Sequence, residues 1–220
     1  MRADPAIAAL AVLLAASAPA AAQQRPTFPP TRDVAVTYEA RVSGADAPHA
    51  FVLRASAAAG RVRLDGELPG YVLVDLKARR ASIVMEQLGM MLDAPPNAGL
   101  EQALALQDGR SFTRKGTATI AGQRCTVWDI VADAASGTAC ITADGTVLRA
   151  DGQDRKGRTG HVVATRVEYG AQPETLFFPP PNLRRVAIAP GPGQGGKGLQ
   201  GLLSGPAAAA VLDRLRGRQP

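Results

Sequence analysis

The two cysteines are the side chains whose types and spacing offer the most chemistry. Cys125 and Cys140 are fifteen positions apart and are the chain's only cysteines. Three uses are open to such a pair: a structural disulfide, a metal site and a redox centre. A C-x-x-C redox centre needs closer spacing, and a metal site needs further ligands that the flanking sequence does not supply. We therefore predict a disulfide, which on the loop-entropy model stabilises the folded chain by about 3 kcal/mol.

The register of the predicted hairpin decides whether this disulfide can form. To face each other directly, the two cysteines need a turn centred between residues 132 and 133. The turn-forming residues Asp133–Gly137 are centred later, on residue 135. Such a turn would move the two α-carbons further apart than the ~7 Å that a disulfide spans. We therefore expect a bulge in the loop, or a loop that begins earlier than its composition suggests, with Val131 already near the turn.

Other catalytic or metal-binding patterns are missing from the sequence. His49 and His161 have no cysteine or second histidine at ligand spacing, which argues against a zinc site. Asp144, Asp151 and Asp154 lack the spacing of a calcium-binding EF-hand and are better explained as turn-forming residues. No G-x-S-x-G motif marks a catalytic serine. We therefore predict that the protein is not an enzyme and that it uses no cofactor or metal ion.

The N-terminal residues have the order of a secretory signal. Residues 1–22 begin with a short segment that carries Arg2, continue with an apolar run and end in the small residues Ala20–Ala22. This order is typical of a cleavable signal peptide, and the apolar run is too short to span a bilayer. We expect cleavage before Gln23 and a periplasmic or secreted protein that is soluble after cleavage. Disulfides persist in those compartments.

Most of the remaining chain alternates apolar and polar residues, which is the period of a half-buried strand. In Val34–Ser43, the apolar residues at 34, 36, 38, 40 and 42 share one face, and polar residues occupy the other. Further strands are expected at 51–56, 60–66, 71–76, 81–86, 112–120, 125–131, 137–142, 146–150 and 161–169. Turn residues recur about every ten residues between them, as in an antiparallel meander. The sequence therefore predicts a mainly β fold built on an antiparallel sheet.

Two segments depart from this period and help to divide the chain. Asn97–Gln107 has no β-branched residue and leucines at helical spacing, so we expect a short helix that covers one face of the sheet. The prolines at 179–181 end the expected strands, because proline lacks the amide donor of a ladder. The predicted division is a signal peptide (1–22), an extension (23–32), a β domain (33–187) and a tail (188–220).

The tail is rich in glycine and proline, and the end of the chain is basic. Residues 184–220 carry six basic residues against Asp213, a net charge of +5, whereas the β domain is nearly neutral. Gly191–Lys197 imitates a phosphate-binding loop, but Gly198 stands where the motif requires a Ser or Thr hydroxyl for Mg²⁺. We therefore interpret this stretch as a linker.

Several short phrases resemble exported bacterial proteins of unknown function that are grouped with the LolA/LolB type, the periplasmic lipoprotein carriers. The phrases are Arg63–Gly66, Tyr71–Asp75, Gly116–Gly122 followed by Cys125, Cys140–Gly145, and Pro173–Pro179. The resemblance implies a curved, unclosed half-barrel with short helices over its hollow. It also implies that this hollow holds acyl chains or a lipoprotein anchor. The chain shows only one helical segment of this kind and no carrier-specific motif.

Two functions of different classes follow. The first is a binding module whose concave face holds a lipid, a lipoprotein or another apolar ligand. The candidate ligand-binding residues, each of which is equally explained as packed core, are Val36, Tyr38, Val62, Leu64, Trp128, Val163 and Val167. The second is a scaffold that docks on an anionic envelope surface through Arg184, Arg185 and the basic tail. A nucleic-acid partner is not expected, because aromatic residues make up only 4% of the chain.

Overall fold

The computed structural model describes one β-sheet domain. The described residues are 25–66, 69–93, 111–131, 135–154 and 157–187. The predicted signal peptide, the predicted helix at 97–107 and the tail lie outside them. Within them the helical elements are two short 3₁₀ turns, η1 (Glu86–Leu88) and η2 (Glu174–Phe177). None of the helices found there has the length and apolar character needed to cross a membrane.

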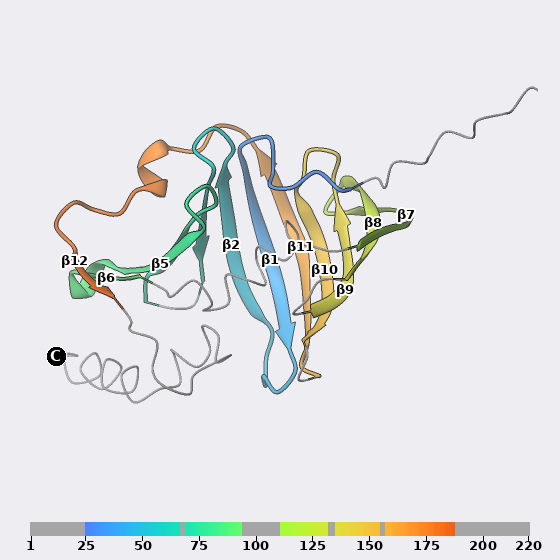
Figure 1. Cartoon of the computed structure of the whole chain (residues 1–220), viewed down its shortest axis with the longest axis horizontal. Coiled ribbons are helices and arrows are strands. Elements are labelled where there is room, and N and C mark those ends of the chain that lie inside the picture. Colours follow the sequence, from blue (N-terminus) through green and yellow to red (C-terminus); the bar gives the residue numbers. More distant parts are fainter. Residues whose placement is uncertain (1–24, 67–68, 94–110, 132–134, 155–156, 188–220) are drawn as a thin grey trace, which may run out of the picture.

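Twelve strands form a single unclosed sheet (Figure 1). They are β1 (Val34–Val42), β2 (His49–Ser56), β3 (Arg61–Asp65), β4 (Tyr71–Asp75), β5 (Arg80–Met85), β6 (Met90–Asp93), β7 (Ser111–Ile120), β8 (Gln123–Val131), β9 (Ala135–Ile141), β10 (Val147–Asp154), β11 (Thr159–Tyr169) and β12 (Arg184–Ala187). Their order in the sheet is β12-β6-β5-β4-β3-β2-β1-β11-β10-β9-β8-β7. All neighbours are antiparallel except β12 and β6, which are parallel. The predicted mainly β, antiparallel and unclosed fold is confirmed.

Strand β1 joins the two halves of the sheet. It pairs with β2 on one side and with β11, the last long strand, on the other. Its residues alternate between buried and partly exposed, as the sequence predicts: Val34 and Val36 are fully buried, whereas Glu39 and Arg41 lie on the opposite face. Burying each of these valines stabilises the fold by about 1.5–3 kcal/mol. The apolar core of the sheet is therefore centred on β1.

Asp33 ties three chain segments together just before β1. Its carboxylate accepts hydrogen bonds from the backbone amide of Ala57 at 2.8 Å and from that of Gln172 at 3.5 Å. Its backbone carbonyl accepts one from the amide of Gly170 at 3.2 Å. The start of β1, the turn after β2 and the segment after β11 are therefore held at one end of the sheet.

The sheet ends in two different edge strands. β7 has a register shift between Arg114 and Gly116, where Lys115 is exposed and pairs with Asp129 at 2.9 Å. β12, at the other edge, has only four residues. The sequence did not predict β6 or β12. The prolines end the long antiparallel strands, as expected, but the chain returns after them to add β12 to the sheet.

The predicted disulfide is present, and of the two expected arrangements the one with Val131 beside the turn agrees with the structure. Cys125 and Cys140 are bonded, with their α-carbons 5.4 Å apart. Cys140 lies opposite Val127, so the cysteines are diagonal neighbours and do not face each other directly. Val131 is the last paired residue of β8, as expected, and lies opposite Ser136. No register shift interrupts the described β8–β9 ladder, so the alternative of a bulge is not needed.

The turn-forming composition of residues 133–137 does not mark the position of the turn, and Gly137 gives the reason. Gly137 belongs to β9 and lies opposite Gly152 of β10. A β-carbon at position 137 would lie 2.0 Å from the carbonyl oxygen of Asp151 and 2.7 Å from the α-carbon of Gly152. The glycine is therefore required for close approach of two backbones within the sheet and not for a turn.

Replacing both Cys125 and Cys140 with alanine is expected to lower the free energy of unfolding by about 3 kcal/mol, because the unfolded chain regains the freedom of the closed loop. Urea unfolding followed by Trp128 fluorescence measures the change. The reduced wild-type protein is the matched control and is expected to unfold with the variant. Equal urea midpoints for the oxidised wild type and the variant would show that the bond adds no stability.

Candidate ligand-binding face and the polar network behind it

Apolar side chains form continuous rows across β11, β1, β2 and β3. One row joins Val167, Val36, Leu53 and Leu64, each in register with the next. The row beside it joins Tyr169, Val34, Ala55 and Val62. Residues in register share one face of a sheet. The pairing therefore gathers the predicted residues Val36, Val62, Leu64 and Val167 on one surface.

This apolar face, defined by the two rows, is packed at its centre and more open at its sides. Val34 and Val36 are completely buried. Leu53, Val62 and Val167 are only partly buried and pack against this central cluster, and the partly buried Leu64 packs against the neighbouring cluster of Val74 and Ala81. The centre therefore acts as core, whereas the flanking side chains keep apolar surface that a ligand can cover.

Tyr38 places one polar group within this apolar surface. Its ring stacks on Phe51, with the ring centroids 5.0 Å apart, and its hydroxyl donates a hydrogen bond to the carbonyl oxygen of Val147 at 2.5 Å. Burial is the main cause that raises the pKa of the Tyr38 phenol above its ordinary value, with a smaller contribution from Tyr169. The phenol therefore stays neutral, and its one donor is already used.

Val163 lies on the opposite face, although it is an even number of residues from Val167. The register of β1 and β11 shifts between Thr37 and Tyr38. The extra residue that this bulge inserts reverses the alternation, so Tyr38 pairs with Ala164 and Val163 pairs with Glu39. The structure therefore places Val163 with the polar side chains of β1.

Trp128 belongs to a separate apolar cluster. It is 7% exposed and packs with Ile130, Ala139 and Ile141 in β8 and β9. This cluster is distinct from the one around Val36. The structure therefore brings together five of the seven predicted residues and leaves Trp128 and Val163 elsewhere.

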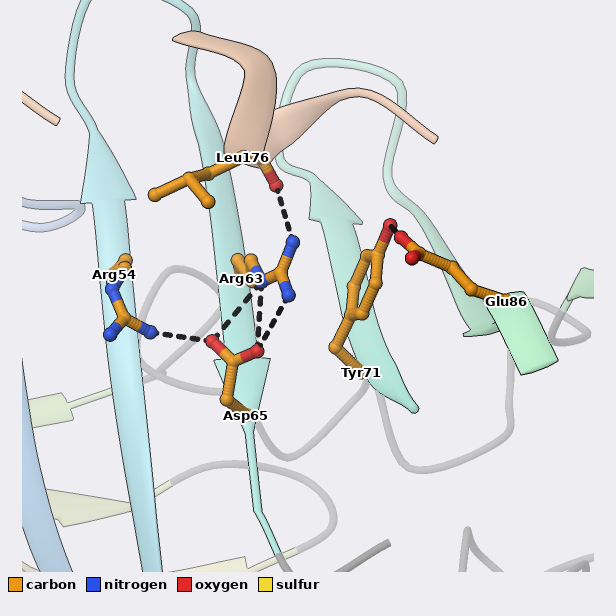
Figure 2. A network of polar contacts seen from close by, with 6 residues as sticks. All are labelled: Arg54, Arg63, Asp65, Tyr71, Glu86 and Leu176. Atoms are coloured by element: carbon orange, nitrogen blue, oxygen red, sulfur yellow. Dashed lines mark hydrogen bonds and ion pairs between the residues drawn. The ribbon is translucent and has the colours of Figure 1, made fainter. Parts of the chain in front are cut away.

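A polar network that the sequence analysis did not predict covers the other face of β3 (Figure 2). The Asp65 carboxylate accepts a hydrogen bond from Arg54 at 2.6 Å and hydrogen bonds from Arg63 Nε at 2.9 and 3.1 Å. Arg63 also donates to the carbonyl oxygen of Leu176 at 3.2 Å, and its guanidinium lies 3.5 Å from the centre of the Tyr71 ring. Arg63 therefore connects three elements at once: β3, β4 and η2.

Tyr71 extends the network to η1. Its hydroxyl donates a hydrogen bond to Glu86 at 2.8 Å. Burial, followed by the hydrogen bond and the charge of Glu86, raises the pKa of Tyr71 from 10.0 to about 12, while Arg63 acts in the opposite direction. The pKa of Tyr71 is higher in the folded chain than in the unfolded chain. The stability that the neutral phenol contributes is therefore complete below pH 10 and is lost as the pH rises towards 12.

Arginines also fasten η2 to the sheet. Arg61 donates to the carbonyl oxygen of Phe177 at 3.1 Å, and its guanidinium lies 4.2 Å from the centre of the exposed Phe178 ring. Phe177 itself is 1% exposed. The last carbonyls of a helical turn lack partners within the turn, and a positive charge there is favourable. Arg61 and Arg63 therefore hold the segment that leads to β12.

The described residues do not form a metal centre from His, Cys, Asp or Glu side chains in groups of three or more.

One correction concerns His161, which the sequence analysis treated as isolated. Its Nδ1 contacts the carboxylate of Asp151, and Arg149 lies 3.3 Å from the other oxygen of that carboxylate. The three side chains are partly exposed on neighbouring strands, as expected for surface ion pairs.

Comparison with known proteins identifies the fold but no family. Neither a family model nor a curated protein matches the sequence. An uncharacterised conserved protein from Thermus thermophilus superposes with a TM-score of 0.51 at 12% identity, over 72% of this chain and 91% of the other. A LolA superfamily protein from Nitrosomonas europaea gives 0.40 at 9% identity, over 68% and 91%.

A third similar structure is MucB, in the MucA/MucB complex of Pseudomonas aeruginosa. It gives a TM-score of 0.44 at 18% identity, over 72% of this chain and 59% of the other, so the chain spans little more than half of that protein. The similarity to the Thermus thermophilus protein, at a TM-score of 0.51, thus shows a shared fold at low sequence identity.

Replacing Arg63 with alanine is expected to lower the free energy of unfolding by about 2–3 kcal/mol, because it leaves the Leu176 carbonyl without a donor and Asp65 with one arginine. Arg63→Lys should recover only part of the loss, since an ammonium cannot form the forked contact with Asp65. Urea titration measures both changes.

Arg41→Ala provides the matched control for this experiment. Arg41 is also an outward-facing strand arginine, but its side chain is 67% exposed and pairs with Glu39 within the same strand. Its removal should cost less than about 1 kcal/mol. Equal losses for the Arg63 and Arg41 variants would contradict the role assigned to the network.

Proposed function

We propose that the protein is an exported, non-catalytic binding module that holds a lipid or acyl chain against its apolar face. One observation carries the proposal: the rows of Leu53, Leu64, Val62 and Val167 are continuous across four strands and remain partly exposed. Burial of such surface against an acyl chain supplies about 25 cal/mol per Å². The buried hydroxyl of Tyr38, beside these rows, already donates its hydrogen bond within the protein.

Two further features support the proposal. The Cys125–Cys140 disulfide is suited to an oxidising compartment such as the periplasm. The resemblance of the sequence to LolA/LolB-type proteins implies a hollow for acyl chains. The ligand contacts proposed on this face are the partly exposed Val62, Leu64 and Val167, whereas the buried Val36 and Tyr38 form the packed layer beside them.

A second candidate is a scaffold that docks on an anionic envelope surface. The observation that favours it is the exposure of Arg184 and Arg185 on the edge strand β12. Each basic residue close to an anionic membrane contributes about 1 kcal/mol of attraction. This candidate needs no ligand on the apolar face, so one set of variants separates the two.

The test is titration of the mature chain with a fluorescent fatty acid, followed by native mass spectrometry of protein purified from its own envelope. Val62→Asn and Leu64→Asn should weaken fatty-acid binding about tenfold or more, because each places a polar group on the apolar face. Val131→Asn is the control, since Val131 is 50% exposed at the end of β8, away from this face.

Failure of the wild type to bind the fatty acid, together with a ligand-free mass after gentle extraction, would reject the binding module. Equal weakening by the Val131 and Leu64 variants would also reject this face as the site. The scaffold is supported instead of the binding module if the protein binds anionic liposomes but no fatty acid. In that case the double variant Arg184→Ala, Arg185→Ala should abolish liposome binding.

A further inference from the structure

The turn between β9 and β10 is a tight loop built around the hydroxyl of Thr142. The amide of Gly145 donates to the carbonyl of Thr142 at 3.1 Å, and the amide of Thr142 donates to the carbonyl of Thr146 at 2.9 Å. The Thr142 hydroxyl oxygen accepts the amide of Thr146 at 2.9 Å and donates to a carboxylate oxygen of Asp144. The hydroxyl oxygen of Thr142 is therefore hydrogen-bonded both to the side chain of Asp144 and to the backbone of Thr146.

Two buried oxygens of this turn have no hydrogen-bond partner. Asp144 Oδ1 accepts from Thr142 and from the hydroxyl of Tyr169 at 3.2 Å, but Asp144 Oδ2 is buried and has no donor. The hydroxyl of Thr146 is likewise buried and without a partner, and the residue is 1% exposed. A buried carboxylate oxygen without a donor or a counter-charge is costly.

Further oxygens converge on the turn from the segment before β1. A β-carbon at Gly145 would lie 2.8 Å from the carbonyl oxygen of Pro29 and 3.1 Å from that of Thr27, so these carbonyls approach the turn closely. The carbonyl of Asp144 accepts a hydrogen bond from the amide of Thr31 at 2.8 Å. Two backbone carbonyls of this segment therefore lie against Gly145, the residue next to Asp144.

The positive charge near the turn does not neutralise Asp144. Arg32 lies over the ring of Tyr169, with its guanidinium carbon 4.1 Å from the ring centre. In the described part of the chain, neither Arg32 nor another arginine or lysine forms an ion pair with Asp144. Asp144 Oδ2 and the Thr146 hydroxyl are therefore the two oxygens available to a ligand.

We infer that this turn, together with the carbonyls of residues 27 and 29, is a binding site for a hard divalent cation, with Ca²⁺ the best fit. Ca²⁺ takes six to eight oxygen ligands from carboxylates, hydroxyls, carbonyls and water. The turn offers oxygen alone, from Asp144, Thr146 and the adjacent backbone. With one carboxylate, the dissociation constant should be about 0.1–1 mM, the range of extracellular calcium modules.

The cation would hold the N-terminal segment against the β9–β10 turn, beside the end of the apolar face where Tyr169 lies. Its role is structural, so it goes beyond the proposed function and does not depend on it. In the sequence, Asp144 is one of three loop aspartates that were weighed as a weak Ca²⁺ site and then explained as turn-forming residues, because they lack EF-hand spacing. The hydroxyl and carbonyl ligands carry no motif spacing, which is why the sequence did not reveal the site.

The test compares thermal unfolding of the mature chain in about 10 mM Ca²⁺ with unfolding in EDTA at matched ionic strength. Ca²⁺ should raise the Tm of the wild type by about 3 °C, as expected for a ligand well above its dissociation constant. Calorimetric titration with CaCl₂ should give one site per chain. Mg²⁺ should act more weakly, because it demands stricter octahedral geometry.

Two variants locate the effect. Asp144→Asn removes the charge, and Thr146→Val removes only the unpartnered hydroxyl and keeps its shape, so it should fold at least as well in EDTA. Both should lose most of the Ca²⁺-dependent shift, whereas Asp46→Asn, a change at an exposed aspartate of the β1–β2 loop, should keep it.

A Ca²⁺ shift that is equal in the wild type, Thr146→Val and Asp46→Asn would overturn the inference, because the ion would then act elsewhere on the surface. No shift and no calorimetric signal in the wild type would overturn it as well, and would mean that water alone satisfies the two oxygens.

Discussion

The pairing of β1 with both β2 and β11 is the interaction on which the rest of the structure depends. Without it the chain would be two separate meanders, β1 to β6 and β7 to β11, each with an exposed edge. The β1–β11 ladder joins residues far apart in the sequence, from Val34 opposite Tyr169 to Val42 opposite Gly160. Forming it requires closing a long loop of chain. The complete burial of Val34 and Val36 helps to offset that entropy.

The two-residue period of a strand then divides the molecule into two surfaces with different properties. In β3, Val62 and Leu64 contribute to the apolar face, while Arg61, Arg63 and Asp65 point the other way and hold η2. A single short strand thus contributes to the proposed ligand surface and to the fastening of the C-terminal segment. A slip of one residue in the register of β3 would exchange these two surfaces. The charge network on the outer side of β3 therefore also helps to fix which side chains face the apolar surface.

Sequence alternation predicted the long strands and most of the apolar face, because both depend on local period. It placed Val36, Tyr38, Val62, Leu64 and Val167 correctly relative to one another. It did not predict the β1–β11 bulge, which depends on the pairing of distant strands and moves Val163 to the other face.

Non-local pairing also limited the other predictions. β6 and β12 have four residues each, which is too short for a periodic pattern, and both depend on strands already in place: β6 on β5, and β12 on β6. The diagonal arrangement of Cys125 and Cys140 follows from a β8–β9 register in which Gly137 belongs to β9, and the role of Gly137 there comes from its close neighbour Gly152 and not from its own turn propensity. The contacts of Arg63 with Asp65 and Leu176 likewise require the folded neighbours to be known.

The two edge strands have a consequence for how copies of the protein meet at high concentration. An open sheet presents unpaired backbone groups at each edge and can grow by adding strands from neighbouring molecules. Here one edge is interrupted by a bulge that carries Lys115, and the other is a four-residue strand with two exposed arginines. A strand from another molecule would meet a bulge at the β7 edge of the sheet and positively charged side chains at both edges. The molecule can therefore keep its sheet open without forming fibres.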